Sequence, residues 1–304
     1  MASTPSASTP ESDSPVTLIT GASTGIGAAS ALELSRRGHR VWASMRDRSR
    51  GEALLEQAGS EALSIQPLEL DVTEDASVDE AVARVLSESG RIDNLIANAG
   101  FHAGGSVEDM PLGTFQGLME TNYLGVIRCV KAVLPSMREK RSGCILGVSS
   151  QSGRFVMPTN AAYCATKYAM EAALETLSLE VSRFGVRVVI VEPGLTFTAA
   201  MDKNVPWPDG TPYQSVYRRT GAIFAEEAHE GSQAEPVAED IATALESSGG
   251  PLRRIIGRDA QRNLGSRSQL DDRDWLDLHR IESDEDFLSR WWDHFGPRPG
   301  EGSD

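Results

Sequence analysis

Cysteine is scarce in this chain of 304 residues, with only Cys129, Cys144 and Cys164 present. Their spacing fits neither a zinc site nor a disulfide framework, so we predict no metal centre and a reducing compartment. Cys164 directly follows Tyr163, which leaves a redox role as an alternative. We favour simple packing for all three thiols, because burial is the usual fate of a free cysteine.

Long apolar runs and an excess of basic residues are also missing. No apolar run approaches the roughly 18 residues that a membrane span needs. Lys and Arg total 29 against 44 Asp and Glu, a formal net charge of −15. Such a balance disfavours broad contact with nucleic-acid phosphates or anionic lipid. We therefore expect no nucleic-acid partner and no membrane span.

Residues 1–15 have neither the arginines of a mitochondrial address nor the apolar segment of a signal peptide. Their Ser, Thr and Pro content is typical of a disordered tail. Together with the cysteine pattern, this predicts a cytoplasmic protein.

Apolar residues, in contrast, make up 40% of the chain and recur in short runs between amphipathic stretches. Strands are predicted at 16–20, 40–45, 65–70, 92–97, 145–148, 186–191 and, at an edge, 253–256. Helices are predicted at 25–37, 74–88, 113–139, 160–184 and 236–248. This alternation predicts an α/β fold with a doubly wound parallel sheet, covered by helices on both faces, in one domain over residues 16–260.

Two segments depart from the alternation. Residues 199–235 form a long excursion rich in proline and aromatic residues, which predicts a lid. Residues 261–304 form an acidic C-terminal extension with eleven acids and six arginines. Within it, 283–295 predicts a helix with Ser283 as N-cap. Its apolar face would carry Leu288, Trp291, Trp292 and Phe295. These aromatics could lie at the rim of the lid, contact a neighbouring subunit, or dock on their own domain for stability.

A glycine-rich turn joins the first predicted strand to the first helix, with the sequence TGASTGIG from Thr20 to Gly27. Gly21 permits the tight turn, Gly25 lets the backbone approach a pyrophosphate, and Gly27 lets the helix pack on the sheet. The unpaired amides of the helix start then face the anion. We predict a dinucleotide phosphate cradle here, and the alternative is a merely tight turn. Its residues are Gly21, Ser23, Thr24, Gly25, Ile26 and Gly27.

Tyr163 and Lys167 are four residues apart on a predicted helix, so their side chains share one face. A phenol with a pKa of about 10 is a poor base at neutral pH. A nearby ammonium would favour the phenolate and lower this pKa. The pair therefore predicts acid–base chemistry, although Y-x-x-x-K alone is common by chance.

Several motifs in order resemble the short-chain dehydrogenase/reductase (SDR) family, which has a Rossmann fold. They cover about residues 16–258 and comprise the G-x-x-x-G-x-G turn, Ala97-Asn98-Ala99-Gly100, Asn122, Ser150, Tyr163 with Lys167, and Pro193-Gly194. The chain is loosely similar to the steroid and retinol dehydrogenase branch. The resemblance implies hydride transfer between a nicotinamide cofactor and a carbonyl or alcohol substrate, with a hydrophobic ketone or aldehyde expected.

The resemblance also implies the catalytic roles. Tyr163 would supply the proton, Ser150 would hold the substrate oxygen, and Lys167 would bind the nicotinamide ribose. Asn122 would mark a local helix distortion that, with Lys167, connects the site to solvent. Without the resemblance, Asn122 would be interpreted as an exposed helix residue of poor propensity.

Cofactor contacts follow from the same resemblance. At the tip of the second strand, Met45 stands where NAD-preferring relatives carry an acid, and Arg46 could grip a 2′-phosphate. We therefore expect NADP(H) rather than NAD(H), with Asp47 as a complication because it could pair with Arg46 or face the ribose. The other implied contacts are Asp71 and Val72 at the adenine, Asn98, Ala99 and Gly100 at the cofactor floor, Tyr163 and Lys167, and Pro193, Gly194, Thr196 and Thr198. Phe197 replaces an Asp often found before the last threonine, which weakens the expectation for Thr198.

Two other function classes stay open at this point. They are a cofactor-sensing binding protein on the same fold and an SDR-type dehydratase or epimerase. Relatives commonly assemble, so a homodimer or homotetramer is expected. The candidate pocket residues are Phe101, His102, Gln151, Phe155, Met157, Leu195 and the lid aromatics, a mostly apolar set. For His102, packing is favoured over catalysis.

Overall fold

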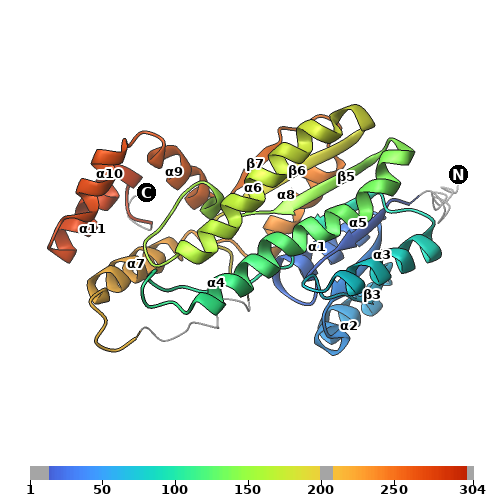
Figure 1. The fold of residues 1–304 in the computed structure, drawn as a ribbon, viewed down its shortest axis with the longest axis horizontal. Coiled ribbons are helices and arrows are strands. Elements are labelled where there is room, and N and C mark those ends of the chain that lie inside the picture. Colours follow the sequence, from blue (N-terminus) through green and yellow to red (C-terminus); the bar gives the residue numbers. More distant parts are fainter. Residues whose placement is uncertain (1–13, 199–207, 300–304) are drawn as a thin grey trace, which may run out of the picture.

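Seven parallel strands form one sheet in the computed structural model, which describes residues 14–198 and 208–299. The strand order is β3-β2-β1-β4-β5-β6-β7 (Figure 1). The strands are β1 (Val16–Ile19), β2 (Arg40–Met45), β3 (Ile65–Glu69), β4 (Asn94–Ala97), β5 (Gly143–Val148), β6 (Val186–Pro193) and β7 (Arg253–Ile256). The predicted doubly wound parallel sheet is confirmed, and every predicted strand is present. The direction of winding reverses between β1 and β4, which is where ligands bind in such sheets.

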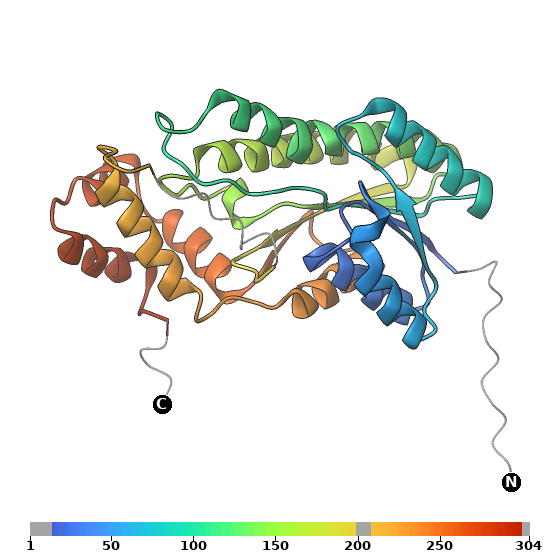
Figure 2. The same cartoon turned by 90° about the horizontal axis from the view of Figure 1, so that it is seen from below.

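Helices cover both faces of the sheet (Figure 2). One face carries α1 (Gly25–Arg36), α2 (Glu52–Ser60) and α8 (Ala234–Glu246), and the other carries α3 (Asp75–Ser89), α5 (Gly125–Lys140) and α6 (Ala161–Val181). Neighbouring strand residues point to opposite faces. Leu18 and Leu95 therefore belong to one apolar core, and Ile19 and Ile96 to the other. Short 3-10 turns occur at Arg48–Gly51, Gln151–Gly153 and Ser182–Phe184.

The three cysteines lie in this packed interior. Cys129, Cys144 and Cys164 are all buried. Burial raises the pKa of Cys129 to about 12 and that of Cys144 to about 11. Such thiols are poor nucleophiles because the reactive thiolate is disfavoured. The prediction of ordinary buried thiols is confirmed.

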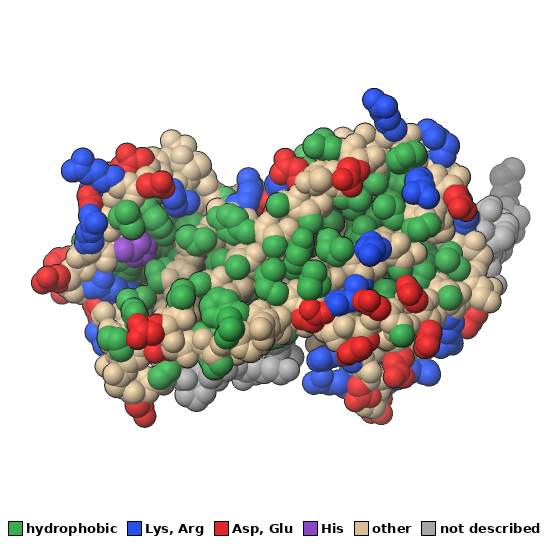
Figure 3. Space-filling model, in the orientation of Figure 1, with side chains coloured by type: hydrophobic (Ala, Val, Ile, Leu, Met, Phe, Trp, Pro, Cys, Tyr) green, Lys and Arg blue, Asp and Glu red, His purple; other side chains and the backbone are tan. Residues whose placement is uncertain are grey.

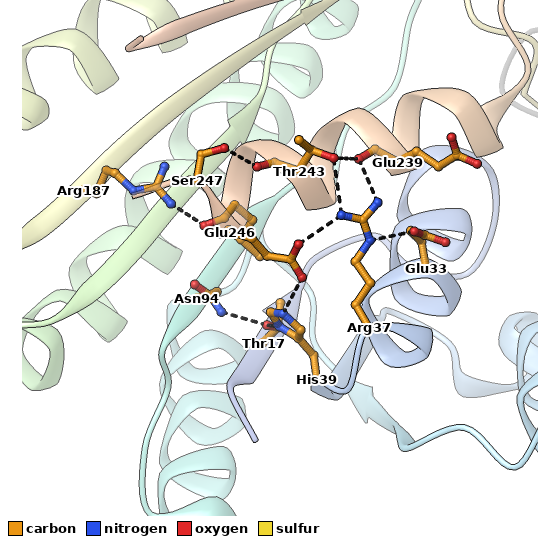
Figure 4. Close-up of polar contacts among 11 residues, drawn as sticks. Thr17, Glu33, Arg37, His39, Asn94, Arg187, Glu239, Thr243, Glu246 and Ser247 are labelled. Atoms are coloured by element: carbon orange, nitrogen blue, oxygen red, sulfur yellow. Dashed lines mark hydrogen bonds and ion pairs between the residues drawn. The ribbon is translucent and has the colours of Figure 1, made fainter. Parts of the chain in front are cut away.

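A polar network closes the amino-terminal edge of the sheet (Figure 4). Arg37, at the end of α1, donates to Glu33 at 2.7 Å and to Glu246 of α8 at 3.0 Å. The Asn94 amide donates to the Thr17 hydroxyl at 3.1 Å, deep between β4 and β1. These contacts fix α1 against α8 at the end of the sheet opposite to the one where ligands bind.

The predicted lid and extension form a helical lobe beside the sheet (Figure 1). It contains α7 (Gln214–Glu227), α9 (Arg258–Arg267), α10 (Asp272–His279) and α11 (Asp284–Phe295). The α11 prediction is confirmed, with the Ser283 hydroxyl accepting from the Asp286 amide at 3.2 Å. Helices α2, α7, α9 and α10 were not predicted. The boundary expected after residue 260 falls inside α9, while residues 1–13 of the expected tail and 199–207 of the expected lid lie outside the described residues.

An aromatic cluster holds this lobe together. Its buried members are Phe155, Met157, Ile223, Leu278, Phe287, Trp291, Trp292 and Phe295. Trp291 and Phe295 stack with ring centroids 4.2 Å apart. Ile223 belongs to α7, and Phe155 follows the 3-10 turn after β5. Within the described residues, the C-terminal aromatics thus pack on their own chain, against a helix of the predicted lid.

The stability of the lobe should depend on pH through His279, which packs edge-on against Trp275 at 4.5 Å. Burial lowers the pKa of His279 to about 4, whereas an unfolded histidine has a pKa of about 6.5. The unfolded chain then binds more protons, so stability is lost as pH falls from about 6.5 to about 4. In urea unfolding over this range, wild type should lose roughly 1–3 kcal/mol more than His279→Gln. The exposed His229→Gln serves as the control, and equal pH slopes for wild type and His279→Gln would contradict the prediction.

Candidate active site

The glycines of the turn after β1 are required by close backbone contacts. Gly21 has φ +66°, and a Cβ there would lie 2.7 Å from the Cα of Ala99. A Cβ on Gly27 would lie 2.4 Å from the carbonyl oxygen of Gly21. Gly25 also has a positive φ, +58°, and a Cβ there would lie 3.0 Å from the Thr198 side chain. The turn therefore brings β1, β4 and the segment after β6 together.

The start of α1 suits an anion. Among the described residues, Thr24 is the N-cap but its side chain caps no amide, and the first turn holds no acid. The first amides of a helix need acceptors and carry partial positive charge. A pyrophosphate would satisfy both requirements. Ser23, Thr24, Gly25, Ile26 and Gly27 thus form a cradle that fits a dinucleotide.

Asn98 and Thr20 join the two strands that flank the cradle. The Asn98 amide nitrogen Nδ2 donates to the carbonyls of Thr20 and Gly21, both at 3.0 Å. The Thr20 hydroxyl accepts from the backbone amides of Asn98 and Ala99, also at 3.0 Å each. The sequence reasoning missed Thr20. Its only signal was its place as the last residue before the glycine turn.

Asn122 lies in a π-helical segment, Glu120–Leu124, between α4 (Leu112–Met119) and α5. The single helix predicted over 113–139 is therefore interrupted at Asn122. Its Oδ1 accepts from the Phe101 amide at 3.0 Å, and its Nδ2 donates to the Phe101 carbonyl at 2.8 Å. Asn122 is 1% exposed, so the interpretation from propensity alone, an exposed helix residue, was wrong.

Ser150, Tyr163 and Lys167 meet at the carboxyl end of β5. Ser150 follows β5 and its hydroxyl forms a hydrogen bond with the Tyr163 phenol. The Lys167 ammonium lies 5.6 Å from the centre of the Tyr163 ring and donates to the Val148 carbonyl at 2.8 Å. Ser150, from the end of a strand, thus forms a single polar cluster with Tyr163 and Lys167, which are one turn apart on α6.

Burial controls the protonation of this cluster. It raises the pKa of Tyr163 to about 12, and the hydrogen bond with Ser150 opposes this only in part. It lowers the pKa of Lys167 to about 8, opposed by the nearby Glu171 carboxylate. The expected lowering of the tyrosine pKa by the ammonium is therefore overridden by burial. At neutral pH, the phenol keeps its proton and the amine is mostly charged.

The segment after β6 completes the floor of the site. Gly194, after Pro193, donates its amide to the Ile256 carbonyl at 2.9 Å. The Thr196 hydroxyl donates to the Gly194 carbonyl at 3.2 Å. Thr198 lies against Gly25 of the cradle. This segment thus lies beside both the cradle and β7, where a bound dinucleotide would extend toward Tyr163.

The tips of β2 and β3 lie at the other end of the cradle. Asp47 accepts from the Ser49 amide at 3.0 Å and hydroxyl at 2.7 Å, so it neither pairs with Arg46 nor faces outward unpaired. Arg46 is exposed, and its side chain has no partner within residues 14–198 and 208–299. Met45, in contrast, is buried against Gly51. Of Met45, Arg46 and Asp47, Arg46 thus has the exposed and unpaired side chain, and Arg48 and Arg50 are exposed in the 3-10 turn that follows.

Asp71 and Val72 follow β3. One Asp71 oxygen accepts from the Thr73 amide at 2.9 Å and hydroxyl at 2.8 Å. The Val72 carbonyl accepts from Arg128 at 3.2 Å. Gly100, at the end of β4, lies against the Asn122 amide, where a Cβ would be 3.1 Å from Oδ1. These contacts order the loops around the expected adenine and nicotinamide positions.

The expected pocket residues are divided between two environments. His102 lies edge-on to Tyr163 with ring centroids 5.0 Å apart, and its Nε2 is 2.7 Å from Asn160 Oδ1. Phe155 and Met157 are buried in the aromatic cluster. A cavity of about 350 Å³ lies between the loops before α4 and α6 and helices α7, α10 and α11. Its lining includes Tyr213 of the expected lid but neither Phe155 nor Met157. Figure 3 shows hydrophobic side chains gathered over this face of the molecule.

Comparison with known proteins agrees with this geometry. The family model for short chain dehydrogenases matches residues 15–209. The chain belongs to this family. Retinol dehydrogenase 8 of Bos taurus is 35% identical over 257 residues, which are 80% of this chain and 81% of that protein. The resemblance to the steroid and retinol branch is thereby confirmed.

Solved structures of short-chain dehydrogenases have a similar fold over most of this chain. A short-chain dehydrogenase from Streptomyces avermitilis has a TM-score of 0.75 at 31% identity, over 92% of this chain and 99% of its own. A short-chain dehydrogenase from Burkholderia cenocepacia J2315, solved in complex with NADP, has a TM-score of 0.69 at 26% identity, over 90% and 99%. The protein is therefore an oxidoreductase of the SDR family that uses a nicotinamide cofactor and acts on CH–OH or C=O groups.

No helix in the described ranges is long and apolar enough to cross a membrane. Within the same ranges, no group of three His, Cys, Asp or Glu side chains is placed to hold a metal ion.

The cradle predicts a strong difference between two glycine-to-alanine changes. Gly27→Ala places a methyl group against the Gly21 carbonyl and the Asn98 amide, so it should destabilise the protein by roughly 1–3 kcal/mol. It should also abolish binding of the reduced nicotinamide cofactor, measured by nucleotide fluorescence. Gly59→Ala is the matched control, because a Cβ there would meet no described atom within 4 Å. Equal stability and binding in the two variants would contradict the close packing described here.

Proposed function

We propose that this protein is an NADP(H)-dependent oxidoreductase that interconverts a hydrophobic ketone or aldehyde with its alcohol. The observation that carries the proposal is the contact between Ser150 and Tyr163 above the Lys167 ammonium. This cluster lies at the same sheet edge as the glycine cradle. A sensor of cofactor level would need the cradle but no acid–base tyrosine.

Proton transfer is the task of Tyr163. When bound, the nicotinamide supplies or accepts the hydride at the substrate carbon. In the reducing direction, Ser150 holds the carbonyl oxygen by a hydrogen bond, and Tyr163 donates its proton to that oxygen. Because burial holds the pKa of Tyr163 at about 12, the donor is fully protonated at neutral pH.

Lys167 has two tasks in this proposal. One of its protons is donated to the Val148 carbonyl, which leaves others for the hydroxyls of the nicotinamide ribose. Its charge stabilises the phenolate left after proton transfer. The pKa of Lys167, lowered by burial to about 8, suits a group that returns a proton to Tyr163. We propose that Asn122, whose Nδ2 donates to the hydroxyl of Thr166 beside Lys167 at 3.3 Å, connects this pair to solvent.

The choice of NADP(H) rests on the tip of β2. Arg46 is exposed, and Asp47 is occupied by Ser49. A guanidinium binds a phosphate through two parallel hydrogen bonds. The NADP complex of the Burkholderia relative supports the same choice. We further propose a cytoplasmic homodimer or homotetramer.

The mechanism predicts that Tyr163→Phe abolishes turnover and retains cofactor binding, because only the transferable proton is removed. Activity is measured as the change in nicotinamide absorbance with a panel of ketones, aldehydes and alcohols, each tested with NADPH and NADH or their oxidised forms. We expect a loss of at least about a hundredfold in kcat with an NADPH Kd within twofold. The matched control is Tyr168→Phe, an exposed tyrosine on the same helix. Turnover of Tyr163→Phe within a few-fold of wild type would overturn the mechanism.

Cofactor preference should change on removal of one guanidinium. Arg46→Ala should weaken NADPH binding by roughly tenfold to a hundredfold, the worth of a charge-assisted contact. NADH binding should stay within twofold, because NADH lacks the 2′-phosphate. Arg138→Ala removes the same charge from an exposed position on α5 and should change neither. If Arg46→Ala retains wild-type affinity for NADPH, Arg46 is only a surface residue.

A further inference from the structure

Helix α9 carries a buried polar face that lies between the active site and the other helices of the helical lobe. Asp259, Arg262 and Asn263 are spaced i, i+3 and i+4, so they share one side of the helix. Asp259 and Asn263 are both 0% exposed. Polar side chains at such depth are destabilising unless they are hydrogen-bonded. Their partners therefore show what α9 holds in place.

The Asn263 amide joins two elements that are far apart in sequence. Its Nδ2 donates to Gln151 Oε1 at 2.9 Å and to Glu227 Oε1 at 2.7 Å. Both hydrogens of the amide are thus used. Gln151 and Glu227 are themselves 7% and 2% exposed, so water competes little for these contacts.

Gln151 opens the 3-10 turn that positions Ser150. Within this turn, the Ser150 hydroxyl accepts from the Ser152 amide at 3.1 Å, and the Gly153 amide donates to the Ser150 carbonyl at 2.9 Å. A side chain fixed at Gln151 restrains the first residue of the turn. Helix α9 therefore restrains the turn that carries Ser150, through the hydrogen bond between Asn263 and Gln151.

Glu227 is the last residue of α7, the helix of the predicted lid. It also pairs with Arg262 at 3.4 Å, and the Arg262 guanidinium lies 5.6 Å from the centre of a Trp292 ring in α11. One end of α7 is thus anchored to α9 and α11. The same Asn263 amide connects this anchor to the serine turn.

Asp259 holds the other active-site segment in a comparable way. Its Oδ2 accepts from the Leu195 amide at 2.5 Å. The carboxylate fills the space that side chains on Gly194 and Gly257 would need, since Cβ atoms there would lie 2.1 and 2.6 Å from its Oδ1. One face of α9 therefore supports both the Ser150 turn and the turn after β6.

We propose that Asn263 is a positioning residue of the active site, which acts through Gln151 to hold the Ser150 turn while anchoring α7 through Glu227. This inference rests on the proposed function. It adds a specific route by which the lobe formed by α7 and α9–α11 supports the reaction geometry.

The kinetic test is a double-mutant cycle of Asn263→Ala and Gln151→Ala. Each single variant should lower kcat by roughly tenfold, the worth of one buried hydrogen bond, with the NADPH Kd within twofold of wild type. The double variant should lose about the same tenfold, because both changes remove one contact. Additive losses of about a hundredfold, or an unchanged kcat in Asn263→Ala, would overturn the proposal.

Asn94→Ala is the matched control for the loss of a buried asparagine. Its amide donates to Thr17 at 3.1 Å at the opposite edge of the sheet (Figure 4). It should lower the free energy of unfolding but leave kcat unchanged. An equal loss of kcat in Asn94→Ala would show a general effect of stability and would also overturn the proposal.

Hydrogen exchange separates this proposal from the proposed function, because it needs no substrate. Amides in a peptide covering residues 148–156 should exchange faster in Asn263→Ala than in wild type, and at the wild-type rate in Asn94→Ala. Unchanged exchange there overturns the positioning role even if the enzyme is active. If no substrate is turned over, the proposed function fails while exchange still decides the role of Asn263. Should Asn263→Ala not fold, Gln151→Ala provides the same two readouts with Glu227 still paired to Asn263.

Discussion

The close contact between the turn after β1 and the end of β4 determines where everything else in the site can lie. Gly21 approaches Ala99 so closely that no side chain fits between them. The Thr20 hydroxyl accepts hydrogen bonds from the backbone amides of Asn98 and Ala99. Because the sheet order reverses at this pair of strands, their carboxyl ends open a crevice rather than a continuous surface. The cradle, the Asn122 distortion and the Ser150–Tyr163 cluster are all arranged around that crevice.

Much of this arrangement follows from local sequence. The apolar runs located all seven strands, down to the short edge strand Arg253–Ile256, because buried parallel strands need continuous apolar residues. Ser283 marked the start of α11 because an N-cap is a local interaction. Ser150, Tyr163 and Lys167 could be placed together because Ser150 follows β5 and the other two lie in the first turns of α6, the helix that comes next after this strand end.

Other features depend on contacts that no local pattern contains. Asn122 and Asn263 are buried by partners 21 and 112 residues away. For Asn122, helix propensity alone suggested exposure, and no local pattern singled out Asn263. Helices α7, α9 and α10 are rich in polar residues and are stabilised by the aromatic cluster rather than by their own periodicity. The direction of the Tyr163 pKa shift was likewise not predictable, because it depends on the depth of burial and not on the neighbouring lysine.

The enclosure of Asp259 by Gly194 and Gly257 has an evolutionary consequence. A side chain at either glycine would require the carboxylate to leave, and loss of the carboxylate would leave the Leu195 amide without its acceptor and open a space between two backbones. Three positions spread over 66 residues are thus coupled, and a single change at any of them should destabilise the protein. Over evolutionary time, replacements in the turn after β6 and at the start of α9 should therefore be tolerated in compensating combinations, so that the two segments change together.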